Sequence, residues 1–155
     1  MATEIERKYL VRGDAWRAHA HGEERYQQGY LANTGRSSVR VRVGGGRAHL
    51  NVKGATVGAS RLEFEYPVPL EDAQVMLREL CPGPIVEKTR YRVRHGSQSW
   101  EVDVFEGDNA GLVVAEIELE DESQAVDLPD WAGEEVTHDV RYYNSNLATT
   151  PFNRW

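Results

Sequence analysis

Hydrophobic and polar residues alternate in short runs along most of the chain. The period of two is typical of β-strands, because successive side chains of a strand point to opposite faces. Turn-forming glycines separate several runs, as at residues 44–46 and 107–111. The pattern predicts strands over residues 3–10, 26–32, 37–43, 47–53, 61–68, 85–95, 98–106 and 112–120.

Three segments interrupt the alternation and are predicted to be helical. Residues 70–81 place apolar side chains at helical spacing between two prolines. Residues 14–20 are expected to form a short helix with Asp14 as its N-cap. Residues 137–147 are expected to form a last helix near the end of the chain. Mostly antiparallel strands with a few helices indicate an α+β fold.

The length of 155 residues suits one domain with a hydrophobic core of its own. No linker, internal repeat or low-complexity stretch divides the chain, so we expect a single domain over residues 1–155. One cysteine, Cys81, excludes an internal disulfide, and the first residues contain no apolar stretch of the length of a signal peptide. These features predict a soluble, cytoplasmic protein.

The charges are 25 acidic against 18 basic residues, which gives a formal net charge of −7. This excess argues against non-specific binding to nucleic acid or to an anionic membrane, since such proteins carry a basic surface. We therefore expect neither nucleic acid nor membrane as a partner. The placement of the charges is more informative than their sum.

Within each predicted strand the charged residues gather on one face, and the strands differ in sign. E-x-E pairs stand on the runs 3–10, 61–68 and 112–120, whereas R-x-R or K-x-R pairs stand on the runs 37–43 and 85–95. The usual explanation of such a face is a sheet that is open to water on one side. A solvated face needs no sorting by sign, so the pattern favours a site.

The chemistry of the sorted residues indicates the ligand. Close carboxylates repel one another unless a cation lies between them, and clusters of oxygen ligands suit Mg²⁺ or Mn²⁺. Arginine and lysine provide donors for phosphate oxygens. If the sheet closes into a barrel, both sets face one lumen, and the apolar faces turn outward against the helices. The residues alone therefore indicate a site for a metal-chelated polyanion.

The first acidic pair belongs to the segment Glu4-Ile5-Glu6-Arg7-Lys8, which resembles the E-x-E-x-K signature of the CYTH, or triphosphate tunnel metalloenzyme, superfamily. The tail over residues 133–142 is also similar to the end of short bacterial members. Between them follow, in the order of that family, Gln28-Gly29-Tyr30, Arg40-x-Arg42, Lys53, Glu63-x-Glu65, Glu87-Lys88-x-Arg90, Asp103 and Glu116-x-Glu118. The resemblance covers essentially the whole chain and implies a closed eight-stranded antiparallel β-barrel, the triphosphate tunnel, with a few flanking helices.

The resemblance also implies roles for single residues. Tyr30 beside Lys8 resembles a Lys–Tyr pair proposed to assist attack on the phosphate. The residues implied for phosphate binding are Lys8, Arg40, Arg42, Lys53, Lys88 and Arg90. Those implied for the metals are Glu4, Glu6, Glu63, Glu65, Asp103, Glu116 and Glu118.

The expected activity is hydrolysis of a linear triphosphate, with inorganic tripolyphosphate giving pyrophosphate and phosphate. Two other activities of the same superfamily stay open, namely class IV adenylate cyclase and thiamine triphosphatase. A non-catalytic polyphosphate-binding module is an alternative of another class. The expected cofactor is Mg²⁺ or Mn²⁺, the expected partner is a small-molecule triphosphate, and the chain is expected to be a monomer or a homodimer.

Overall fold

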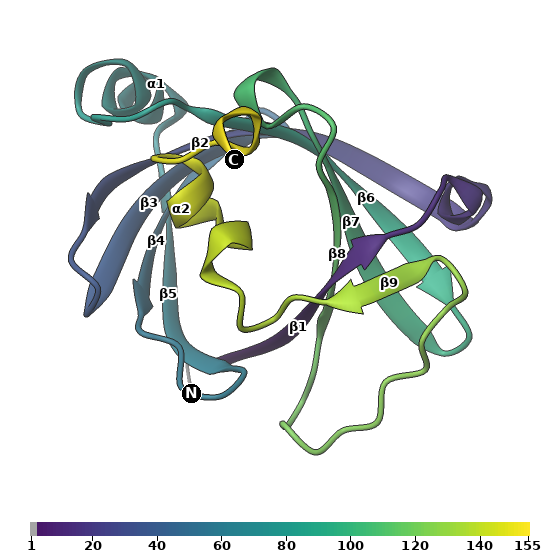
Figure 1. The fold of residues 1–155 in the computed structure, drawn as a ribbon. Coiled ribbons are helices and arrows are strands. Elements are labelled where there is room, and N and C mark those ends of the chain that lie inside the picture. The colour runs from purple at the N-terminus through teal and green to yellow at the C-terminus, as the bar shows by residue number, and fades with distance from the viewer. Residues whose placement is uncertain (1–2) are drawn as a thin grey trace.

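In the computed structural model, which describes residues 3–155, the strands form one antiparallel barrel (Figure 1). The strand order is β5-β4-β3-β2-β6-β7-β8-β1-β9, and pairing of β5 with β1 closes the first eight strands on themselves. This confirms the expected eight-stranded barrel and adds a ninth strand. The strands are β1 (Thr3–Val11), β2 (Ala20–Asn33), β3 (Ser37–Gly44), β4 (Arg47–Gly54), β5 (Ser60–Val68), β6 (Val86–His95), β7 (Gln98–Phe105), β8 (Val113–Glu118) and β9 (Ala132–Glu135).

Three strand predictions are corrected. β2 begins at Ala20 rather than at residue 26, because the polar stretch before Tyr26 pairs with β6 over residues that carry little apolar alternation of their own. β8 ends at Glu118, two residues before the predicted end at residue 120. The short strand β9 was not predicted, since its sequence AGEE has no hydrophobic period.

The helices are fewer than the strands, and all but α1 are short. The predicted helix over 70–81 is confirmed as α1 (Leu70–Glu79). Residues 15–19 form a 3₁₀ helix in which Asp14 holds the N-cap position without a capping hydrogen bond from its side chain. Further 3₁₀ turns are Gly107–Asn109, Val140–Tyr142 and Phe152–Arg154. No helix of the described chain has the length and apolar character needed to cross a membrane.

The predicted continuous helix over residues 137–147 is wrong. The segment contains only the 3₁₀ turn at residues 140–142 and the short helix α2 (Asn144–Leu147), and Tyr143 between them has extended backbone angles of −69° and 135°. This break directs the backbone oxygen of Tyr142 at the ammonium group of Lys8, 3.1 Å away. The backbone oxygen of Tyr142 thus accepts a hydrogen bond from Lys8 instead of one within a continuous helix.

A seam in the barrel explains the path of this part of the chain. β5 pairs with only three residues of β1, from Thr3 to Ile5, and β9 takes the same edge of β1 from Tyr9 onward. After β9 the chain continues beside β1, where the backbone N–H of Lys8 donates to Thr137 Oγ1 at 3.0 Å. We call residues 136–148 the C-terminal segment. It lies in the seam between β1 and β5 (Figure 1).

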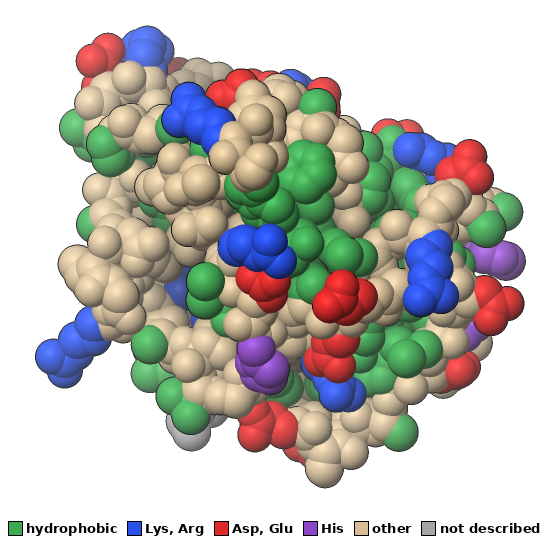
Figure 2. All heavy atoms as spheres, in the orientation of Figure 1, with side chains coloured by type: hydrophobic (Ala, Val, Ile, Leu, Met, Phe, Trp, Pro, Cys, Tyr) green, Lys and Arg blue, Asp and Glu red, His purple; other side chains and the backbone are tan. Residues whose placement is uncertain are grey.

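Apolar residues pack on the outside of the barrel and also fill one of its ends. Outside, Trp16, Trp100 and Trp131 belong to a cluster beneath the loops, as expected for an outer layer. At one end, the alternation turns Val86 of β6, Phe105 of β7 and Val114 of β8 inward, and these side chains pack against Leu147 and Ala148. Seen from this side, atoms of the protein cover the end of the barrel (Figure 2).

Candidate functional site

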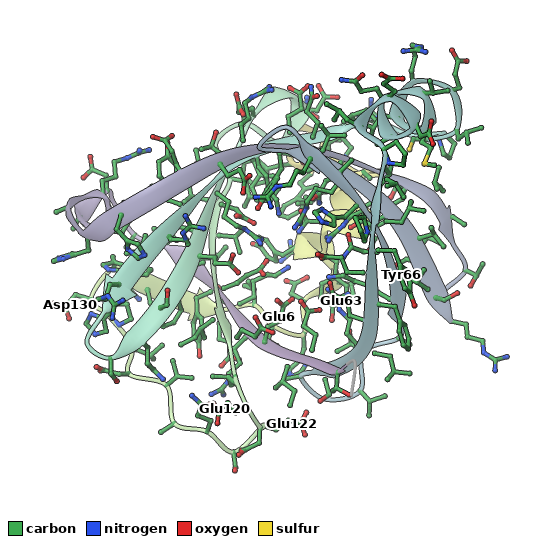
Figure 3. All side chains as sticks on the ribbon, turned by 180° about the vertical axis from the view of Figure 1, so that it is seen from behind. Glu6, Glu63, Tyr66, Glu120, Glu122 and Asp130 are labelled. Carbon is green, nitrogen blue, oxygen red and sulfur yellow. The ribbon has the colours of Figure 1, made fainter. Side chains whose placement is uncertain are left out.

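A polar cavity of about 600 Å³ fills the rest of the barrel interior. In Figure 3, Glu6 and Glu63 point into this interior, whereas Tyr66 of β5 points away from it and is 56% exposed. Thirteen of the fourteen residues predicted for the site line the cavity. They are Glu4, Glu6, Lys8, Tyr30, Arg40, Arg42, Lys53, Glu63, Glu65, Lys88, Arg90, Glu116 and Glu118.

Asp103 is the predicted site residue that lies behind the cavity wall. It is 1% exposed, and its carboxylate accepts hydrogen bonds from Lys88 Nζ at 2.7 Å and from Arg90 Nε and Nη2 at 2.8 and 2.9 Å. Burial alone would raise the pKa of Asp103, but Arg90 and Lys88 outweigh burial and lower that pKa to about 2. Asp103 therefore fixes two cations of the cavity wall in place.

The two arginines of β3 have a different environment. Arg40 is 5% exposed, its Nε has no hydrogen-bond partner, and within residues 3–155 neither Arg40 nor Arg42 forms an ion pair with a carboxylate. Arg42 donates from Nε to Gln28 Oε1 at 2.8 Å and lies 4.4 Å from the centroid of the Tyr26 ring. Burial, with the like charges of Arg40 and Arg90, lowers the pKa of Arg42 to about 10. This wall carries positive charge that the protein does not neutralise.

Carboxylates are in excess where β1 meets β8. Glu6 lies directly opposite Glu118 in the strand register. Burial, together with the negative charges of Glu116 and Glu4, raises the pKa of Glu6 to about 8. Burial and neighbouring carboxylates also raise the pKa of Glu118. The nearest cation to Glu6 is Arg61, whose Nη2 is 3.6 Å away.

A mixed network joins β1, β4 and β5 near the closure of the barrel. Lys53 Nζ lies 3.3 Å from Glu4 and 3.8 Å from Glu63, and Arg61 Nε lies 3.0 Å from Glu4. Burial and the charge of Arg40 lower the pKa of Lys53 to about 8 in spite of Glu4. Lys53, predicted for phosphate, is therefore paired here with two glutamates predicted for the metals.

Lys8 connects the cavity to the C-terminal segment. Its ammonium group lies 3.7 Å from Glu116, donates to the Tyr142 oxygen, and is 5.6 Å from the centroid of the Tyr143 ring. Tyr30, the tyrosine proposed beside Lys8, also lines the cavity and faces Arg40 in the register. Together with Tyr26, which lies beside Arg42, the cavity thus presents three tyrosines to the cations.

Several cavity residues were not singled out from the sequence. Arg61 and Glu101 share strand faces with predicted site residues, so the alternation itself could have identified them. Asn144 and Tyr143 carried no such signal, because they follow the break in the C-terminal segment. Other residues of this kind are Glu24, Tyr26, Arg47, His49, Thr137 and Ser145.

The donor set fits a hard divalent cation. The carboxylates around Glu6 and Glu118 offer only oxygen, and burial together with neighbouring carboxylates raises the pKa of both residues, which a bound cation would reverse. In the part of the chain that the structure describes, no three acidic, histidine or cysteine side chains already converge into a ligand group. Lysines and arginines hold several of the carboxylates instead, so a bound ion would replace those contacts.

Known proteins resemble this chain over most of its length. A family model described as the CYTH domain matches residues 2–149. A protein of Acetivibrio thermocellus named inorganic triphosphatase is 49% identical over 152 residues, which is 98% of this chain and 97% of that protein. A protein of Nitrosomonas europaea with the same name is 39% identical over 153 residues, 94% of this chain and 97% of that one.

Solved structures show the same barrel. The crystal structure of an inorganic triphosphatase superposes with a TM-score of 0.68 at 34% identity, over 96% of this chain and 95% of the other. A Hippeastrum protein, described as a putative adenylyl cyclase with a dominant triphosphatase activity, has a TM-score of 0.60 at 14% identity, over 76% of this chain and 80% of its own. The second likeness concerns the fold alone.

Proposed function

The chain belongs to the CYTH domain family, and on that premise we propose that it is a metal-dependent hydrolase of linear triphosphates. Inorganic tripolyphosphate is the proposed substrate, and pyrophosphate and phosphate are the products. Two relatives that match nearly the whole chain carry the name inorganic triphosphatase, which supports this choice. We further propose that residues 1–155 form a single domain of this family.

The arginines of β3, of which Arg40 is buried and Arg42 half-buried, carry the proposal, because neither has a carboxylate partner within the described residues. A charged guanidinium without a partner is costly to bury, and an anion in the cavity removes that cost. Arginine forks match phosphate oxygens, and the other cations of the cavity wall extend the row of donors. The proposed phosphate ligands are Lys8, Arg40, Arg42, Lys53, Lys88 and Arg90.

The acidic side of the cavity is the proposed place of the metal. Glu4, Glu6, Glu116 and Glu118 would hold it, with Glu63 and Glu65 of β5, which line the same cavity, proposed to assist. When bound, Mg²⁺ or Mn²⁺ polarises the phosphates and lowers the pKa of a water molecule. Asp103 acts differently from the other proposed ligands, because its oxygens already hold Lys88 and Arg90.

The residues of the chain itself do the positioning on which phosphoryl transfer depends. The arginines of β3 hold the phosphates and neutralise the charge on their oxygens. Lys8 Nζ, fixed between Glu116 and the C-terminal segment, donates to the phosphate that is attacked. Lys8 and Tyr30 are the proposed pair that assists the attack of water.

One experiment tests the function and its alternatives together. Purified protein is incubated with tripolyphosphate, ATP or thiamine triphosphate, each with Mg²⁺, with Mn²⁺ and with EDTA, and the products are identified. We expect pyrophosphate and phosphate from tripolyphosphate, and no turnover in EDTA. Cyclic AMP from ATP would instead indicate a cyclase. Tight tripolyphosphate binding without turnover of any substrate would indicate a binding module.

The proposal also includes the cellular compartment and the oligomeric state of the protein. The single cysteine suits a reducing compartment, so we propose a cytoplasmic protein. We propose a monomer or a homodimer whose partner is the small-molecule triphosphate, without nucleic acid or membrane. Light scattering of the purified protein measures the assembly directly.

A further inference from the structure

We propose that Asn144, in the C-terminal segment, is a positioning residue that sets the spacing between two rows of phosphate-binding cations. The inference rests on the proposed function, because it concerns how the same cavity holds a triphosphate. Asn144 begins the short helix α2 and lines the cavity. It belongs to none of the residues that carried the resemblance.

The side-chain oxygen of Asn144 accepts two hydrogen bonds from two different strands. Lys88 Nζ of β6 donates to Oδ1 at 3.0 Å, and Gln28 Nε2 of β2 donates to the same atom at 3.0 Å. An ammonium group has only donors, so the atom that faces it must be the oxygen of the amide. The orientation of the Asn144 amide is therefore chemically determined.

Each of the two bonds leads to another cation of the cavity wall. Through its Oε1, Gln28 accepts from Arg42 Nε at 2.8 Å. Lys88 shares the carboxylate of Asp103 with Arg90. One carbonyl oxygen thus links Arg42 of β3 to the cation pair of β6.

Burial makes this linkage stiff. Gln28 is 0% exposed and Lys88 is 1% exposed, so neither has water to replace a lost acceptor. Arg42 has no carboxylate partner in residues 3–155, and Gln28 is the acceptor that orients its guanidinium. Without Asn144, the Gln28 amide loses its anchor and the direction of Arg42 is no longer fixed.

The spacing between the cation rows matters because a triphosphate must meet several donors at once. Displacement of catalytic or binding groups by about 1 Å is enough to reduce such multiple contacts severely. The contacts between these cations and the phosphates are made in the bound substrate as well as in the transition state, so their loss acts mainly on substrate binding. Asn144 acts through Lys88 and Gln28 and needs no contact of its own with the substrate.

The test compares Asn144→Ala with Asn146→Ala, a matched control on the same helix. Asn146 Nδ2 donates to the Arg141 oxygen at 3.5 Å and does not line the cavity. We expect Asn144→Ala to raise KM for tripolyphosphate about 10-fold, the loss expected for one hydrogen bond to a charged group, with kcat within about 3-fold. Asn146→Ala should leave both constants unchanged. A merely structural role would lower kcat through loss of active protein and leave KM unchanged, and this result would overturn the proposal.

A second variant separates the two branches, and by itself it keeps the linkage testable if Asn144→Ala does not fold, because it too should raise KM for tripolyphosphate. Gln28→Leu breaks the branch to Arg42 and leaves the contact of Asn144 with Lys88. If Asn144 acts through Gln28, the double variant raises KM by less than the product of the two single effects. A rise in KM of the double variant equal to the product of the two single rises would contradict the linkage.

Binding without turnover keeps this inference apart from the proposed function. Calorimetric titration with tripolyphosphate in EDTA measures affinity whether or not the protein hydrolyses it. If the unmodified protein binds but shows no turnover, the proposed function fails and the inference can still hold. If turnover is present and Asn144→Ala binds as tightly as the unmodified protein, only the inference fails.

Discussion

The two cation pairs of the cavity look alike in the sequence and differ in the structure. Arg40 and Arg42 on β3, like Lys88 and Arg90 on β6, stand two residues apart on the inner face of a strand. On β6 both cations are bound to the buried carboxylate of Asp103. On β3 neither cation has a carboxylate partner within the described residues.

Strand register produces the difference. Arg90 lies directly opposite Asp103 on β7, whereas Arg40 lies opposite Tyr30 on β2 and Asn51 on β4. The β6 pair is therefore held by a carboxylate of the wall, whereas the β3 pair has no such partner within the described residues. Both pairs are proposed to bind phosphate, but a basic motif on a strand is the stronger indication of an anion site where the neighbouring strands leave it unpaired.

The largest expected effect comes from removing the charge that neutralises the β6 pair. Asp103→Asn leaves Lys88 and Arg90 buried without their carboxylate, and breaking such a buried pair costs about 3 to 5 kcal/mol of unfolding free energy. Urea denaturation of the metal-free protein measures it. Glu79→Gln is the control, since Glu79 pairs with Arg78 at the exposed surface, and a change below about 1 kcal/mol is expected there.

The same variant tests whether Asp103 is a metal ligand. If Asp103→Asn retains its stability and loses only metal affinity, the carboxylate serves the metal and the contrast between β3 and β6 is wrong. Titration of the variant with Mn²⁺ gives that affinity.

Removing a cation from β3 should have the opposite effect, with stability kept and substrate binding weakened. Arg40→Gln takes away an unneutralised charge, so the protein should remain at least as stable, while KM for tripolyphosphate rises about 10- to 100-fold because a hydrogen bond between charged groups contributes about 1.5 to 3 kcal/mol. Steady-state kinetics and thermal melting measure the two quantities. Arg36→Gln, at an exposed position just before β3, is the control and should change neither. A large loss of stability in Arg40→Gln would show that Arg40 supports the fold.

A smaller effect is expected from the ligand alone. Because the β3 pair needs no metal to attract an anion, tripolyphosphate in EDTA should stabilise the protein by about 1.4 kcal/mol at ten times its dissociation constant. Thermal melting with and without the ligand measures this. The stabilisation should disappear in the double variant Arg40→Gln/Arg42→Gln, and its persistence would place the anion elsewhere.

Another effect concerns the acidic side of the cavity and its response to pH. The folded pKa of Glu6 is about 8, against a usual value of 4.5. Between these values the folded state holds a proton that the unfolded state has released, so this residue lowers stability as pH rises from about 4.5 to 8. Glu6→Gln removes an effect of about 4 kcal/mol at pH 8, so its melting temperature in EDTA should exceed that of the unmodified protein by about 10 °C at pH 8 and by little at pH 5. Equal differences at both pH values would contradict the raised pKa.

The barrel was predictable because its strands carry a strict alternation. Val39, Val41 and Val43, which alternate with Arg40 and Arg42, mark the outer face of β3, and similar patterns define seven further strands. β9 and the first half of β2 were missed, because pairing with neighbours rather than a local pattern makes them extended. The helix expected over residues 137–147 failed for a related reason, since contacts with Lys8 interrupt it at Tyr143.

The members of the site were predictable, but their pairing was not. Alternation shows which side chains face the lumen, and it placed Glu6, Lys8 and Arg42 there correctly. It cannot show that Asp103 lies behind Lys88, because that depends on the register of β6 against β7. Asn144 carries no periodic signal at all, and only the path of the C-terminal segment through the seam brings it to the cavity.

The apolar filling of one barrel end has a kinetic consequence. Val86, Phe105 and Val114 pack against the end of α2, so the interior opens away from that end. The substrate that enters and the products that leave then pass through the same opening, one after the other. We expect pyrophosphate to compete with the substrate for free protein, so that release of the larger fragment limits how soon the next molecule can enter.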